Sequence, residues 1–136
     1  MNRATPSLEW PDHYPDGCPP SIARPRSENV FVFVRRRRPT GADFRSKHDR
    51  GWRPEEGADS SEHCRACGVS VSPTLTDAQE LQKLIPFFAK LRIAAGPPTP
   101  GVVASTHGPF PQLNHMTWWI PRGATPWRGF NVQGGA

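Results

Sequence analysis

Residues 30–34 read Val-Phe-Val-Phe-Val and are the stretch of sequence that decides the fold. Five consecutive β-branched or aromatic residues favour an extended strand. Apolar side chains at every position place apolar groups on both of its faces, which is typical of a strand covered on both sides. We therefore expect a central, fully buried strand. Four arginines and Pro39 follow it, and the proline should end it.

Short runs rich in apolar residues mark further candidate strands downstream. Val69 and Val71 alternate with serines, which predicts a half-buried strand. Residues 91–95 and 102–104 flank a turn rich in proline and glycine, so we expect them to form a hairpin. The remaining candidates are 115–120 and 130–132.

One amphipathic helix is expected in the middle of the chain. Thr76 and Gln79 have the spacing of a capping box at its start. Apolar residues then recur at helical spacing and form one stripe. Pro86 should end the helix at about Leu84 or Ile85.

The regions outside these elements are rich in proline, glycine and polar residues. Residues 1–29 contain six prolines, which exclude a helix or a central strand and predict an extended arm. Residues 40–62 are polar and predict a loop, with one helical turn at 43–46. The remaining 30–136 fit the size of one domain. The expected class is α+β, with about five short, mostly antiparallel strands, one main helix and long Pro/Gly-rich loops.

The charge of the chain predicts an anionic partner. The formal net charge is +5, and 14 of the 17 basic residues are arginines, whose planar guanidinium suits phosphates and carboxylates. The candidate binding residues combine arginines with indole rings that could stack on bases or fill a protein hot spot; they are Arg35, Arg36, Arg37, Arg38, Trp119, Arg122, Trp127 and Arg128. The alternative is that the arginine run is a solvated strand end that discourages edge-to-edge aggregation.

Three cysteines and several histidines raise the question of a metal. Cys64 and Cys67 have the C-x-x-C spacing of a zinc site, with His63, His48 and Cys18 as further candidate ligands. The alternative is a pair of small buried thiols without metal. No cofactor is favoured, and zinc stays an alternative. An odd, small number of cysteines predicts reduced thiols and a cytoplasmic location, and no apolar run is long enough for a membrane span.

A second candidate site follows from residues 115–119. His115 and Thr117 are two apart on a predicted strand, so they share a face beside tryptophan rings. A titratable ring, a hydroxyl and an aromatic wall suit a nucleotide pocket. The alternative is that these residues are part of the core.

Several ordered segments resemble a class of small uncharacterised bacterial proteins over residues 10–132. They are Trp10-Pro11, Gly17-Cys18-Pro19-Pro20, Asp43-Phe44-x-Ser46, Cys64-x-x-Cys67-Gly68 and His115-x-Thr117-Trp118-Trp119. A fainter resemblance is to ADP-ribosyltransferase-like folds. It implies that Arg35 and Ser46 stand beside NAD, together with a late acidic residue. No Asp or Glu follows Glu80, so that third position has no counterpart.

Taken together, the sequence predicts a binding or regulatory protein that engages an anionic partner, either nucleic acid or an acidic protein face, and that belongs to a mobile element or a bacterial conflict system. One alternative is a small nucleotide- or NAD-handling enzyme with the candidate catalytic residues Arg35, Ser46, His115 and Thr117. The other alternative is a zinc-stabilised module.

Overall fold

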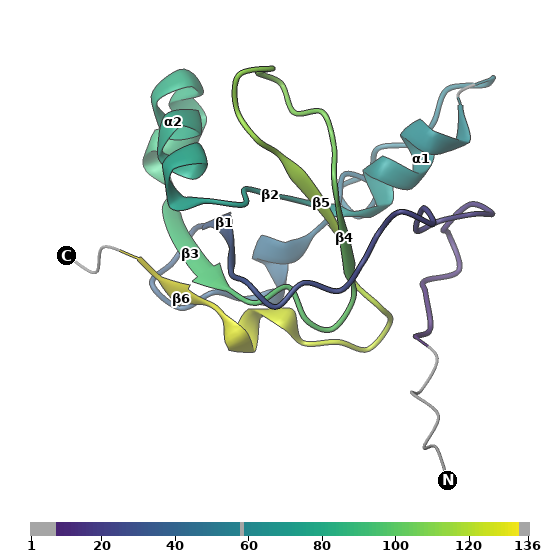
Figure 1. Cartoon of the computed structure of the whole chain (residues 1–136), viewed down its shortest axis with the longest axis horizontal. Helices are drawn as coiled ribbons and strands as arrows, with labels where there is room; N and C mark the ends of the chain where they lie inside the picture. Colours follow the sequence, from purple (N-terminus) through teal and green to yellow (C-terminus); the bar gives the residue numbers. More distant parts are fainter. Residues whose placement is uncertain (1–7, 58, 134–136) are drawn as a thin grey trace, which may run out of the picture.

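The computed structural model describes residues 8–57 and 59–133. It combines helices with short strands that pair in an antiparallel manner, which is the α+β class (Figure 1). The strands are β1 (Val30–Val34), β2 (Val69–Val71), β3 (Arg92–Gly96), β4 (Val102–Ser105), β5 (Met116–Trp119) and β6 (Asn131–Val132). The helices are α1 (Ser60–Cys67) and α2 (Leu75–Leu84), with 3-10 turns η1 (Gly41–Phe44), η2 (Pro86–Lys90) and η3 (Pro126–Gly129).

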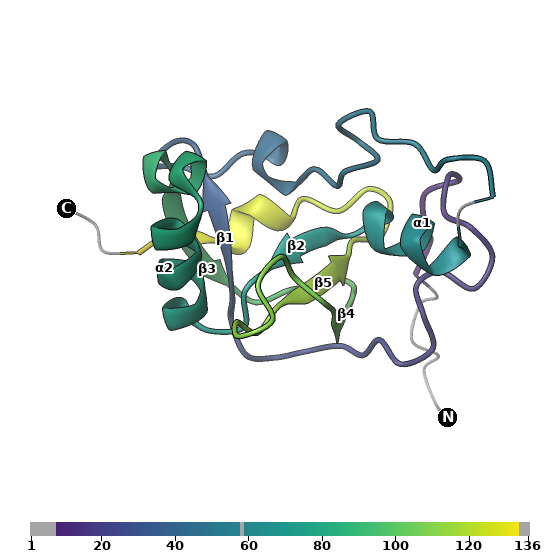
Figure 2. The ribbon, with the colours of Figure 1, turned by 90° about the horizontal axis from the view of Figure 1, so that it is seen from above.

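The six strands form two antiparallel sheets of three strands each. Their orders are β1-β3-β6 and β2-β5-β4. The two sheets meet at an antiparallel bridge between Phe31 of β1 and Ser72, just after β2. Seen from above, α2 lies beside the first sheet and α1 lies at the far end of the second (Figure 2). The predicted α+β class is confirmed, with one strand and one helix more than expected.

β1 is a strand as predicted, but it is an edge strand of its sheet and not the central one. Val30, Val32 and Val34 face the core and are buried, whereas Phe31 and Phe33 on the other face are half-buried. The run is apolar on both faces because Phe33 stacks on Phe88 of η2, with ring centroids 4.4 Å apart. Full burial on both faces was therefore a wrong expectation.

The core lies between the two sheets and is built around Trp118, which is 0% exposed. Its ring stacks on Phe130 and meets the edge of Phe44. The indole N–H donates to the carbonyl of Pro100 at 3.2 Å, so the ring is buried without an unsatisfied donor. Both sheets thus share one hydrophobic core.

Two of the expected local structures differ from those observed. β3 and β4 belong to different sheets, so residues 97–101 connect the sheets and do not close a hairpin. α1 begins inside the segment 40–62, which was expected to be loop. Its N-cap, Asp59, and Glu62 three residues later have the spacing of a capping box, a signal that the expectation did not use. α2 ends at Leu84 as predicted, but its N-cap is Thr74, two residues earlier than expected.

Residues 8–29 are packed against the second sheet and α1. Cys18 forms a disulfide with Cys64, which corrects the expectation of three reduced thiols; Cys67 is free and buried. The hydroxyl of Tyr14 donates to the Cys67 carbonyl at 3.3 Å, and Arg24 pairs with Val103 of β4. Within the described residues, no helix combines the length and apolar character needed to cross a membrane.

Candidate functional site

A cleft of about 690 Å³ opens between β1 and β2, on the face that also carries η2 and the loop after η1. This volume is within the range of small-molecule and peptide sites. The two strands are held together at the Phe31–Ser72 bridge and separate beyond it. Phe33 lines the cleft on the β1 side and Ser70 on the β2 side. The cleft is therefore the gap between two sheet edges.

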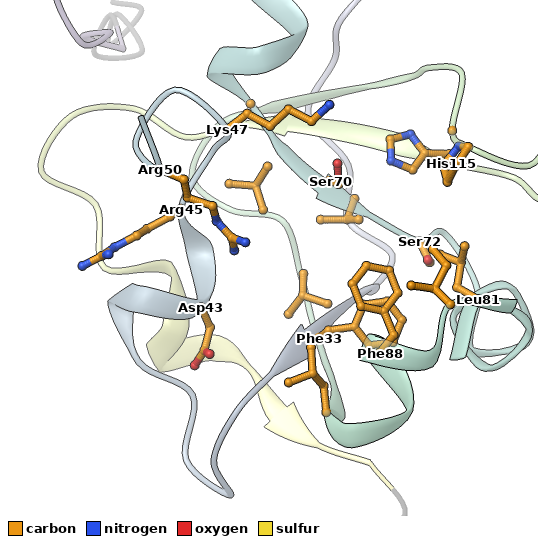
Figure 3. Close-up of a pocket in the computed structure, with 18 of the residues that line it drawn as sticks. Phe33, Asp43, Arg45, Lys47, Arg50, Ser70, Ser72, Leu81, Phe88 and His115 are labelled. Atoms are coloured by element: carbon orange, nitrogen blue, oxygen red, sulfur yellow. The ribbon is translucent and has the colours of Figure 1, made fainter. Parts of the chain in front are cut away.

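The two sides of the cleft differ in character. One side is apolar, with Phe33, Phe88, Leu81 and Ile85 among its lining residues. The other side carries Lys47 and Arg50, which Figure 3 shows across the cleft from Phe33 and Phe88. A ligand that fills the cleft would meet aromatic rings at one end and cations at the other.

Basic side chains outnumber acidic ones around the cleft. Five Lys or Arg residues line it, against two acids, Asp43 and Glu62; the five are Arg35, Arg45, Lys47, Arg50 and Arg65. None of the five belongs to an ion pair within the part of the chain that the structure describes, where the pairs are Arg26–Glu28, Glu80–Lys83 and Asp12–Arg122. The Asp43 carboxylate accepts hydrogen bonds from the backbone N–H groups of Arg35 and Thr40. The cleft thus has an excess of unpaired positive charge.

Backbone groups at the sheet edges also face the cleft. The backbone N–H and C=O groups of Phe31 and Ser72 point away from their own sheets and bond to each other. In an antiparallel ladder, the backbone groups of every second residue point the same way. The backbone groups of Phe33 and Ser70, two residues away on each strand, therefore point into the cleft. Outside the strand ladders, no backbone hydrogen bond involves either residue in the part of the chain that the structure describes. Such edges can pair with an added strand.

His115 lines the cleft and begins a chain of side-chain hydrogen bonds. Its Nδ1 lies 2.9 Å from the Thr106 hydroxyl, which lies 2.8 Å from the hydroxyl of Thr117. Burial lowers the pKa of His115, which favours the neutral form of its ring. Thr117 is only 2% exposed and cannot touch a ligand in the cleft. Thr106, which links the two, was not identified from the sequence.

The candidate catalytic residues are not brought together. Arg35 and His115 line the cleft, but Ser46 lines a separate cavity of about 160 Å³. Ser46 is 2% exposed, and its hydroxyl accepts a hydrogen bond from the backbone N–H of Asp49 at 3.1 Å. The contact of Ser46 is therefore local and structural. No nucleophile–base pair forms among the four candidates, Arg35, Ser46, His115 and Thr117.

The predicted binding residues lie in different places. Arg36, Arg37 and Arg38 are exposed in the bend after β1 and do not line the cleft. Trp119 is 1% exposed and donates its indole N–H to the Cys64 carbonyl, so it is a core residue and cannot contact a partner.

The three remaining candidates lie near the C-terminal end of the chain. Arg122 pairs with Asp12 of the N-terminal segment. Trp127 lines the smaller cavity, and Arg128 is exposed.

The C-x-x-C pair is not a ligand pair in this structure, because Cys64 is bonded to Cys18 and Cys67 alone is free. His48 and His63 stack loosely, with ring centroids 6.1 Å apart. His48 does belong to a group of potential metal ligands, but the other members are His13 and Asp49. The sequence offered one signal for this group, the adjacent His48-Asp49, and none that would bring His13 to it.

Comparison of the chain with protein-family models, with curated proteins and with solved structures finds no match.

Proposed function

We propose that this protein binds an anionic partner in the cleft between β1 and β2. The observation that carries the proposal is the charge around the cleft of about 690 Å³, which is lined by five basic and two acidic side chains. Among the described residues, none of the five basic side chains is in an ion pair. Unpaired cations facing a concave surface attract negative charge, and this attraction weakens as salt rises.

Of the two predicted kinds of partner, the cleft favours an acidic protein segment over nucleic acid. The backbone groups of Phe33 and Ser70 offer an extended chain the hydrogen bonds of an added strand. The basic side of the cleft would then contact acidic side chains of the bound segment. The apolar side, with Phe88 and Leu81, would contact an apolar side chain of the same segment. The proposed role is that of a binding or regulatory module, as the sequence predicted.

The affinity of a labelled peptide of alternating glutamate and valine, measured by fluorescence anisotropy, tests the proposal. The variant Arg45→Ala/Arg50→Ala should bind it at least about tenfold more weakly, a loss of about 1.4 kcal/mol. The matched control is Arg36→Ala/Arg38→Ala, which removes the same charge from exposed positions outside the cleft. The control should bind normally, and equal weakening in both variants would show only a general charge effect.

The variant Ser70→Pro separates the two kinds of partner. Proline removes the backbone N–H that faces the cleft and changes no charge. It should weaken the peptide and leave the binding of a short single-stranded oligonucleotide unaffected. If the oligonucleotide binds more tightly than the peptide and Ser70→Pro changes neither, the partner is nucleic acid. If the protein binds neither probe at low salt, the proposal is wrong.

A further inference from the structure

His13, His48 and Asp49 bring three potential metal ligands to one point, on the other side of the loop that borders the cleft. One ligand atom from each residue lies within 4.8 Å of those from the other two. The two imidazole rings stack, with centroids 3.8 Å apart and an interplanar angle of 6°. Donors bound to one tetrahedral zinc at about 2.0–2.1 Å lie about 3.3 Å apart. Because the lone pair of an imidazole nitrogen lies in the ring plane, the two stacked rings must tilt toward each other before both can bind one ion.

A buried and unsatisfied nitrogen is the second observation. The Nε2 atom of His13 is buried and has no hydrogen-bond partner within the described part of the chain. A buried polar atom without a partner costs free energy and calls for an explanation, such as an ion or water that binds there. His13 and Asp49 also line the smaller cavity of about 160 Å³, which has room for water beside them.

The surrounding structure holds the three ligands in place. Ser46 and Asp49 exchange hydrogen bonds: the Ser46 N–H donates to Asp49 Oδ2, and the Asp49 N–H donates to Ser46 Oγ, each at 3.1 Å. This leaves Asp49 Oδ1 without a hydrogen bond among the described residues. The backbone N–H of His48 donates to the Ala66 carbonyl of α1. The disulfide joins the arm that carries His13 to the same helix.

We propose that His13, His48 and Asp49 form a binding site for a divalent transition-metal ion, zinc first, with water from the adjacent cavity completing the coordination. Two imidazoles and one carboxylate suit zinc and its neighbours in the first transition row, whereas Ca²⁺ and Mg²⁺ prefer oxygen ligands. In this site Ser46 is a positioning residue that fixes the carboxylate of Asp49.

The site is tested by titrating the oxidised, metal-stripped protein with zinc and following the heat released and the melting temperature. We expect one zinc per chain, a rise in melting temperature and, with Co²⁺ as a probe, the visible absorption of a tetrahedral complex. His13→Asn and Asp49→Asn should each weaken zinc binding by at least about tenfold. Asp49→Asn keeps an oxygen that can accept from the Ser46 N–H, so it tests the site even if His13→Asn fails to fold.

Two controls distinguish this site from other ligands nearby. His63→Asn removes the imidazole that stacks beyond His48 but is not one of the three ligands. Cys67→Ser removes the free thiol. Both variants should bind zinc as the parent does. The proposal is overturned if zinc neither binds nor raises the melting temperature, or if these controls lose as much affinity as Asp49→Asn.

Discussion

Phe31 and Ser72 exchange two backbone hydrogen bonds, each 2.9 Å long, and so join the edges of the two sheets. Beyond this pair β1 and β2 separate, and the cleft begins. The bridge is buried on the Ser72 side, since Ser72 is only 2% exposed. It is therefore both a link in the fold and the closed end of the proposed binding site.

Proline at position 72 should destabilise the protein more than proline at position 70. Ser72→Pro removes the N–H that donates to Phe31 and leaves a carbonyl unsatisfied, which should lower the free energy of unfolding by about 1–3 kcal/mol. Ser70→Pro removes an N–H that points into the cleft and should cost less. Urea denaturation of both variants checks the difference. Equal losses would mean that the orientation we assign to Ser70 is incorrect.

The two faces of β1 should respond differently to a charge. Val32 is 3% exposed in the shared core, so Val32→Asp leaves an unpaired buried carboxylate that costs several kcal/mol and should prevent folding. Phe33 is half-buried at the cleft, where water can reach a carboxylate. Phe33→Asp should therefore fold with reduced stability and lose the acidic peptide. Circular dichroism and thermal melting of both variants measure this, and a Phe33→Asp protein as unfolded as Val32→Asp would contradict it.

Removal of the disulfide should lower the stability of the protein. Cys18 and Cys64 are 46 residues apart in sequence, and closing a loop of that length restricts the unfolded chain by about 4 kcal/mol in the chain-entropy model. Cys18→Ser/Cys64→Ser should lose most of that amount in urea denaturation, and adding reductant to the parent should reproduce the loss. A parent whose stability is the same with and without reductant would show that the bond does not form.

Cys67 should be unreactive in the folded protein. Burial raises the pKa of its thiol to about 11, with a smaller contribution from the Asp49 carboxylate. Because the thiolate is the reactive form, about one molecule in a thousand carries it at pH 8. Labelling with iodoacetamide should be slow in buffer and fast in denaturant. Rapid labelling of the native protein would contradict both the burial and the pKa.

Local patterns in the sequence predicted much of the secondary structure but not the arrangement of the strands. The Val30–Val34 run predicted β1, yet an apolar pattern on both faces cannot distinguish a central strand from an edge strand covered by η2. Residues 96–101 looked like a hairpin turn, because a turn signal carries no information about which sheet the next strand joins. Pairing between sheets depends on contacts far apart in the chain.

The candidate sites show the same limit. The excess of arginine predicted an anionic partner, which stays a prediction. The binding residues chosen from the sequence included the run at 35–38 but not Arg45 and Arg50, which line the cleft. Trp119 looked like a contact residue and is core, because one-sequence patterns do not show burial. Cys18 and His13 come from the arm, and only the folded chain brings them to Cys64 and His48. The cytoplasmic location also stays a prediction, and a disulfide of this kind is rare in a reducing compartment.

Side chains of the loop at 45–50 line both the cleft and the smaller cavity. Arg45, Lys47 and Arg50 line the cleft, whereas Ser46 and Asp49 line the smaller cavity behind it. An ion that restrains this loop from behind lowers the entropy that a ligand in front must overcome. Thermodynamic reciprocity then requires the ligand to raise the affinity for the ion by the same factor. One short loop would thus couple two binding equilibria without any movement of the sheets.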